Sequence, residues 1–126
     1  MSVVVEVENR SGVEVDADVA AALARRVLAG DGLDEGDVGI QFVGEDEIRS
    51  LKHAHLGIDE TTDVLSFPID RKEELPPGVP RQLGDVVLCP QVAGADWRRP
   101  LVHGLLHLLG HEHGDAMERI EAVFEQ

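Results

Sequence analysis

The chain is poor in cysteine and in aromatic residues, and each shortage argues against a class of protein. Its 126 residues include one cysteine, Cys89, so no disulfide can form within the chain. A small domain held together by disulfides is therefore excluded, and we expect a reducing compartment. Aromatic residues make up only 3% of the sequence. A surface that binds single-stranded nucleic acid by stacking bases on several rings is therefore not expected.

Long apolar segments are also missing. The first six residues contain neither a basic start nor an extended apolar run, so we expect no signal peptide. No stretch approaches the ~20 apolar residues of a membrane-spanning helix. A cytoplasmic protein with no membrane partner is the resulting expectation. Hydrophobic residues nevertheless make up 43% of the chain, which predicts one folded domain with a real core rather than a disordered chain.

Positive charge is scarce as well. The chain has 25 acidic and 11 basic residues, which gives a formal net charge of -14. An acidic surface repels a phosphate backbone, so non-specific binding to nucleic acid should be weak. The simplest interpretation is a solvated surface that keeps the protein soluble. A role on nucleic acid would then need a local basic patch or a metal ion.

Apolar periodicity predicts four strands and about four to five helices. We expect the strands near residues 3–7, 38–42, 64–67 and 85–89, with a loop over residues 69–83. We expect the helices after Asp16, from about Asp46, from about Pro100 to Gly110, and from about Asp115. This order predicts an α+β fold over residues 1–126, with a four-stranded sheet packed against helices.

Histidines are concentrated near the end of the chain, in the pattern H-x-x-x-H-x-x-G-x-x-H. On a helix His103 and His107 lie one turn apart, where two imidazoles can bind one zinc ion at ~2.0–2.1 Å. Gly110 is expected to end the helix and let the chain turn back towards His113. We therefore predict one Zn²⁺ on His103, His107 and His113, with a fourth position left for water, as in catalytic zinc sites.

Two alternatives to this ligand set stay open. His111 would extend the row of His103 and His107, but three ligands on one straight row do not converge on a point, so we favour His113. The histidines can also be ordinary packed or surface residues, as a lone histidine usually is. Three histidines and a water would also suit nickel, copper or iron.

Gly104 argues against a peptidase. Zinc peptidases with the HExxH motif need a glutamate directly after the first histidine as general base, and this chain has glycine there. A different zinc hydrolase remains an alternative. The pattern alone therefore predicts a metal site without the peptidase base.

Three segments of the sequence are similar to motifs of one known family. They are His103 to Gly110 followed by His113, Thr62 to Pro68, and Leu83 to Cys89. In this order and at this chain length they resemble the YbeY family of bacterial metal-dependent endoribonucleases. The resemblance implies a compact α+β fold, zinc on His103, His107 and His113, and cleavage of single-stranded RNA.

In that family the substrate is chiefly the 3′ end of small-subunit ribosomal RNA, with a further role in ribosome quality control. The resemblance therefore implies ribosomal RNA and ribosomal particles as partners, together with ribosomal proteins or an assembly GTPase, and no dinucleotide cofactor. A non-catalytic zinc-containing ribosome assembly factor is the main alternative function. The sequence does not decide whether a metal-bound water or the RNA 2′-OH attacks phosphorus.

The catalytic residues are less well defined than the metal ligands. Besides the metal-bound water, Asp85 is the candidate general base, although it can equally orient a ligand histidine or accept hydrogen bonds from backbone donors. Ser66 is either a hydrogen-bond donor to the site or an ordinary strand serine. Leu56 stands where family members often carry an arginine that grips RNA. Four residues near it either substitute in part or belong to a solvated helix face: Arg49, Lys52, His53 and His55.

Overall fold

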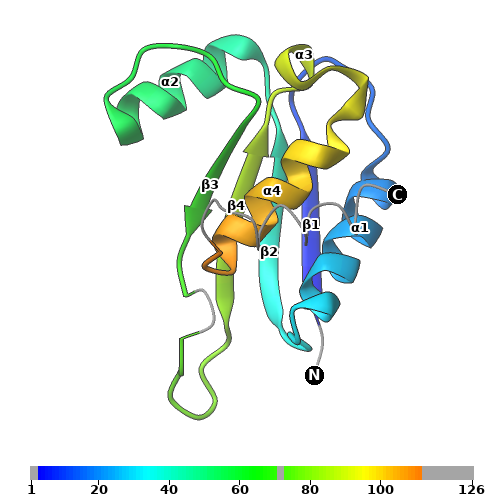
Figure 1. Ribbon diagram of the computed structural model, residues 1–126, viewed down its shortest axis with the longest axis vertical. Helices are drawn as coiled ribbons and strands as arrows, with labels where there is room; N and C mark the ends of the chain where they lie inside the picture. The colour runs from blue at the N-terminus through cyan, green and yellow to red at the C-terminus, as the bar shows by residue number, and fades with distance from the viewer. Residues whose placement is uncertain (1–2, 71–72, 112–126) are drawn as a thin grey trace.

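A four-stranded sheet organises the fold, which the computed structural model describes over residues 3–70 and 73–111 (Figure 1). The strands are β1 (Val3–Asn9), β2 (Gly36–Phe42), β3 (Val64–Pro68) and β4 (Gln82–Leu88), in the spatial order β1-β2-β4-β3. β1, β2 and β4 are parallel, and β3 is antiparallel to β4. The predicted α+β fold with a four-stranded sheet is confirmed.

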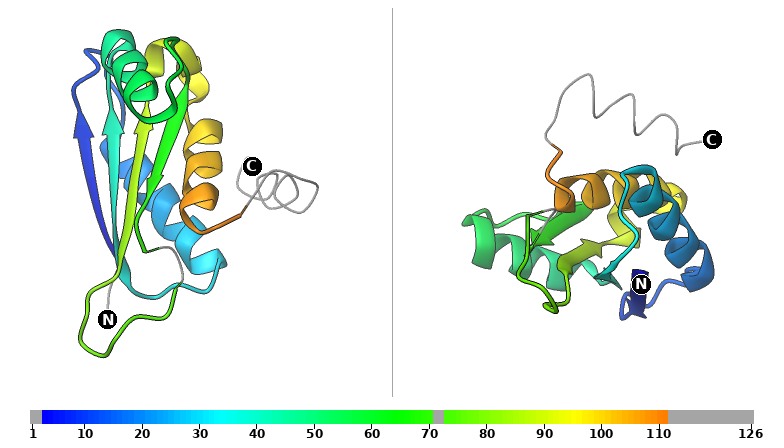
Figure 2. Two further views of the ribbon diagram at one scale, coloured as in Figure 1. Left: turned by 90° about the vertical axis from the view of Figure 1, so that its left-hand side faces the viewer. Right: turned by 90° about the horizontal axis from the view of Figure 1, so that it is seen from below.

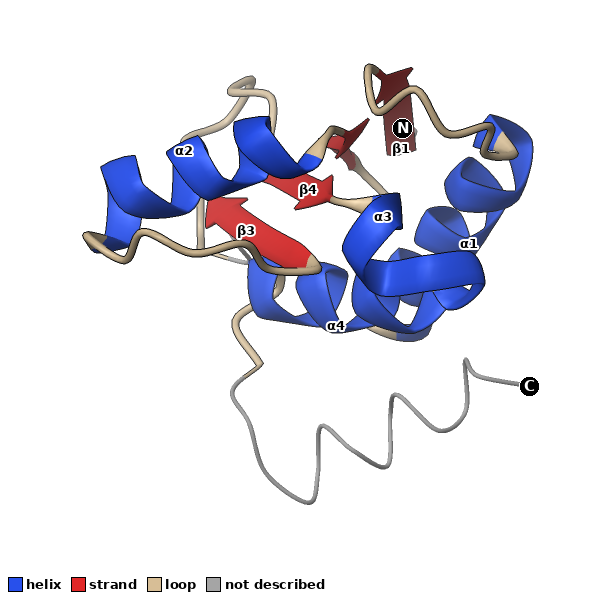
Figure 3. Cartoon of the chain, turned by 90° about the horizontal axis from the view of Figure 1, so that it is seen from above, coloured by secondary structure: helices blue, strands red, loops and turns tan. Residues whose placement is uncertain are grey.

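Helices lie on both faces of this sheet. They are α1 (Ala17–Gly30), α2 (Glu45–Leu56), α3 (Pro90–Ala93), the short 3₁₀ turn η1 (Gly94–Asp96) and α4 (Arg98–Leu108). α1 and α4 cover one face, and α2 lies on the opposite face beside β3 and β4 (Figures 2 and 3). None of the helices in the described part of the chain is long and apolar enough to cross a membrane. The helix predicted from about Asp115 lies outside the described residues.

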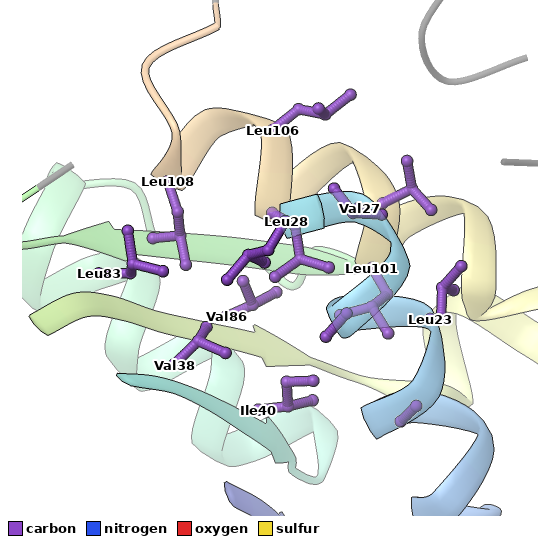
Figure 4. Packing of buried hydrophobic residues seen from close by; sticks show 14 of the residues in the cluster. Leu23, Val27, Leu28, Val38, Ile40, Leu83, Val86, Leu101, Leu106 and Leu108 are labelled. Carbon is purple, nitrogen blue, oxygen red and sulfur yellow. The ribbon is translucent and has the colours of Figure 1, made fainter. Parts of the chain in front are cut away.

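Two groups of buried side chains hold these layers together. The larger lies between the sheet and the pair α1 and α4, and Leu28, Ile40 and Leu101 are among its fully buried members (Figure 4). The smaller lies under α2 and contains Ile48 and Cys89. Burial of apolar surface on both faces explains the continuous apolar run from Val86 to Leu88 in β4.

Two predicted boundaries shift by a few residues. β4 begins at Gln82 rather than Asp85, because its pairing with the preceding strand continues past Pro68: Asp70 N donates to Gln82 O at 2.9 Å. The predicted loop is correspondingly shorter. α4 begins at Arg98, so Pro100 is its third residue. A proline costs no helical hydrogen bond there, since the first-turn N–H groups have no acceptor within the helix.

Asp16 caps α1 as the sequence predicted, and its side chain accepts hydrogen bonds from the backbone N–H groups of Asp18 at 3.0 Å and Val19 at 3.2 Å. We expect Asp16→Ala to lower the free energy of unfolding by about 1 kcal/mol, because two N–H groups lose their acceptor. Urea denaturation measures the change. The exposed loop residue Asp34, changed to alanine, controls for the lost charge. Equal stability of the two variants would contradict the capping role.

Candidate metal centre

The site begins with two histidines of α4. His103 and His107 are both half-buried, and the centroids of their rings are 4.6 Å apart at an interplanar angle of 77°. Their Nε2 atoms are 3.0 Å apart. The helix therefore turns both imidazoles so that the same ring nitrogen of each points to one place.

This arrangement fits a metal ion. Two nitrogens bound tetrahedrally at ~2.0–2.1 Å lie about 3.3 Å apart, and the observed separation of 3.0 Å needs only a small side-chain adjustment to reach that value. Neutral imidazole nitrogens are also suitable ligands for zinc and for several other first-row metals. The Nε2 atoms of both rings thus point towards one position where such an ion could bind.

Gly104, directly after the first of these histidines, lies where α4 packs closely against the sheet. A Cβ atom added to Gly104 would lie 2.7 Å from Cγ1 of Val86 and 3.0 Å from Cγ2 of Val64. Both distances are shorter than packed carbon atoms tolerate. A side chain has no room at this position, so the glutamate of zinc peptidases cannot be placed here without moving the helix.

Ser66 on β3 forms a hydrogen bond with α4 at Gly104. Its Oγ donates a hydrogen bond to the carbonyl oxygen of Gly104 at 2.9 Å. Of the two roles open to Ser66 from the sequence, the structure shows a hydrogen-bond donor, and the acceptor is the helix backbone between the two histidines. The strand motif from Thr62 to Pro68 and the histidine motif therefore meet in space.

α4 ends as Gly110 predicted. Gly110 has φ +94° and its N–H bonds to His107 O at 3.0 Å, while the N–H of His111 bonds to Leu106 O at 3.0 Å. This pair of bonds is the Schellman arrangement that closes a helix at a left-handed glycine. The helix therefore ends before His111, so His111 does not continue the helical row of His103 and His107.

The side chain of His111 is engaged elsewhere. Its Nε2 lies 2.8 Å from Oδ1 of Asp31, which follows α1. Across residues 3–70 and 73–111, no group of three histidine, cysteine, aspartate or glutamate side chains is placed to hold a metal ion. His103, His107 and His111 therefore do not form a three-ligand site, and His113 lies outside the described residues. No local pattern in the sequence links Asp31 to His111, since 80 residues separate them.

Asp85 is not brought to the histidine pair. Its neighbour on β4, Val86, faces α4, and alternation along a strand turns Asp85 to the other face of the sheet. There its carboxylate lies over Gly39 of β2 and lines an open depression of about 190 Å³ together with Glu6. The geometric basis for Asp85 as general base at this site is therefore missing, because a four-stranded sheet separates it from the histidines.

The basic residues of α2 are matched by acids. Arg49 Nε lies 2.7 Å from Asp59 Oδ1, and Lys52 Nζ lies 2.9 Å from Glu60 Oε1. The hydrogen bond from Arg49 lowers the pKa of the Asp59 carboxyl below its usual value. Leu56, the last residue of α2, is 59% exposed. These contacts favour the solvated-face interpretation over a surface prepared for RNA.

The sequence is similar to one family of known proteins over most of its length. A family model described as "Endoribonuclease YbeY" matches residues 6–126. A Salinispora tropica protein named "Endoribonuclease YbeY" is 37% identical over an alignment of 137 residues, which covers 93% of this chain and 87% of the relative. A Halorhodospira halophila protein of the same name is 41% identical over 104 residues, covering 69% of this chain and 65% of the relative.

A solved structure shares the fold. The solution structure of a Thermotoga maritima protein aligns with a TM-score of 0.57 at 21% identity, covering 95% of this chain and 85% of that one. At this level of identity the likeness supports the architecture of sheet and helices alone. The family model and this structural match each cover nearly the whole chain.

Gly104→Ala tests the close contact between α4 and the sheet. Overpacking should cost about 1–3 kcal/mol, offset by about 1 kcal/mol from the better helix propensity of alanine. We therefore expect a net loss of about 1 kcal/mol in the free energy of unfolding, measured by urea denaturation. Gly30→Ala, at the exposed end of α1, is the matched control and should lose nothing. A Gly104→Ala protein as stable as the Gly30→Ala control would refute the contact.

Proposed function

The chain belongs to the YbeY family, and on that premise we propose that it is a metal-dependent endoribonuclease that cleaves single-stranded RNA. In this proposal the substrate is the 3′ end of small-subunit ribosomal RNA, and the protein also acts in ribosome quality control. Both relatives named above are called endoribonucleases, and their alignments cover 93% and 69% of this chain. The structural observation that supports this function most directly is the close approach of the Nε2 atoms of His103 and His107 on α4.

The metal in this proposal is one zinc ion held by His103, His107 and His113. The first two residues fit it by geometry, and the third follows from the histidine spacing after Gly110. A zinc ion supplies Lewis-acid polarisation of a phosphoryl oxygen and lowers the pKa of water. The chain contributes a helix fixed against the sheet at Gly104, which keeps the two imidazoles in place while the substrate binds.

The acidic composition shapes the proposed choice of partner. A net charge of -14 opposes binding to free RNA, and two basic residues of α2, Arg49 and Lys52, face acidic partners. We therefore assign much of the binding to protein contacts on a preassembled ribosomal particle in the cytoplasm, from ribosomal proteins or an assembly GTPase. The metal ion would then supply positive charge only where the scissile phosphate lies.

One observation favours a second function. Leu56 exposes an apolar side chain where the family often has an RNA-gripping arginine. A ribosome assembly factor with a structural metal ion, and no cleavage of its own, would tolerate this change. The two functions differ in whether removal of a metal ligand abolishes RNA cleavage.

His107→Ala separates the two functions. We expect cleavage of precursor small-subunit RNA in ribosomal particles to fall roughly 100-fold or more, because a metal ligand is lost. The measurement is the rate of product formation on a gel, with a chelator-treated wild-type sample in parallel. Restored activity when zinc is returned to the chelated sample is also expected.

The control is His53→Ala, which removes an exposed histidine from α2 on the other face of the sheet. It should cleave at the wild-type rate. Equal residual cleavage by His107→Ala, chelated and untreated proteins would instead identify a contaminating nuclease and favour the assembly factor.

Free RNA should bind poorly. We expect a dissociation constant weaker than about 1 µM for a short single-stranded RNA near physiological salt, since the chain is strongly acidic. Fluorescence anisotropy at several salt concentrations measures it, and small-subunit particles should bind more tightly under the same conditions. Tight binding of free RNA that is insensitive to salt would contradict a particle-dependent substrate.

A further inference from the structure

The contact between His111 and Asp31 joins the end of α4 to the end of α1. The two side chains are 26% and 14% exposed, and Nε2 of His111 lies 2.8 Å from Oδ1 of Asp31. Because a carboxylate can only accept a hydrogen bond, the ring N–H at Nε2 is the donor. That nitrogen therefore has no lone pair to give to a metal ion. Opening the contact would also leave a largely buried carboxylate without this donor, which is costly.

Both ends of the contact are fixed to helices. The backbone N–H of Asp31 bonds to Val27 O and Leu28 O, each at 3.1 Å. The backbone N–H of His111 bonds to Leu106 O at 3.0 Å, and the preceding Gly110 closes α4. The side-chain contact therefore connects two rigid elements across the point where the chain leaves the histidine helix.

We propose that Asp31 and His111 are positioning residues for the metal centre, and that they act by fixing the chain just before the third ligand. This inference rests on the proposed zinc site. His113 follows His111 by two residues in the sequence, so little chain separates the fixed point from the proposed third ligand. Ordering the backbone of even one residue costs the equivalent of about tenfold in an equilibrium constant. Because the contact already orders the chain at His111 in the metal-free protein, metal binding does not have to supply this free energy.

The assignment of His111 as a metal ligand makes the opposite prediction. If His111 bound the ion through Nε2, Asp31 would compete for that atom, and removing Asp31 would leave metal affinity unchanged or raise it. If Asp31 holds His111 so that His113 can bind, its removal lowers metal affinity. The direction of the effect decides between the two roles.

Asp31→Ala is the main test. Affinity for Co²⁺ and Zn²⁺ is measured by competition with a chromophoric chelator, and the visible absorption of the Co²⁺ protein reports its ligands. We expect affinity to fall about tenfold while the absorption spectrum keeps the wild-type shape, because the ligand set is unchanged. Asp31→Asn should retain near-wild-type affinity, since the amide Oδ1 still accepts from His111. Asp34→Ala removes an exposed carboxylate from the same loop and should leave affinity unchanged.

His111→Ala tests the other half of the pair, and it leaves the backbone contacts of Asp31 in place. It should also weaken binding about tenfold, and the double variant Asp31→Ala with His111→Ala should be no weaker than either single variant. Loss of stoichiometric metal in His111→Ala, together with full affinity in Asp31→Ala, would overturn the proposal. So would equal affinities in Asp31→Ala and Asp34→Ala.

A failure of the zinc site itself gives a different result. If the wild-type protein binds neither ion, or binds it equally well after His107→Ala, the proposed function and this inference both fall. If the wild type binds an ion through His107 while Asp31→Ala changes nothing, only the positioning role is wrong. Thermal unfolding of each metal-free variant shows whether the variant is still folded at the temperature of the binding measurement. We expect all of them to be folded there, so that the lower metal affinity does not come from unfolding.

Discussion

The close contact between α4 and the sheet at Gly104 is the constraint on which the rest of the site depends. With no side chain at this position, the helix lies directly against Val86 and Val64 and accepts a hydrogen bond from Ser66. His103 and His107, on either side of Gly104, therefore belong to a helix that is packed tightly against the sheet. The same contact excludes a carboxylate after the first histidine, so the packing that fixes the two histidines also distinguishes the proposed centre from the zinc peptidases.

The histidine pair and the depression lined by Glu6 and Asp85 lie on opposite sides of the sheet. His103 and His107 lie on the side of α1 and α4, whereas Glu6 and Asp85 line an open depression on the other side. The sheet keeps these carboxylates away from the proposed metal ion, where they would otherwise oppose a bound phosphate. An acidic protein can in this way present a metal centre to RNA while most of its surface repels RNA.

Features encoded in short stretches of sequence were predictable. The strands, the cap at Asp16, and the end of α4 at Gly110 follow from alternation and from the conformations that these residues favour. Features that depend on the packing of distant elements were not. Neither the face to which Asp85 points nor the hydrogen bond between His111 and Asp31 has a local signal, because both are set by strand register and helix packing.

The metal ligands themselves are the central claim, and X-ray absorption of the zinc-loaded protein tests them most directly. The account predicts one ion per chain, with three imidazole nitrogens at ~2.0–2.1 Å and one further light atom. The spectrum of His107→Ala should show one imidazole fewer or no retained ion. An ion with a sulfur ligand, or an imidazole count that is unchanged in His107→Ala, would contradict a centre built on His103 and His107.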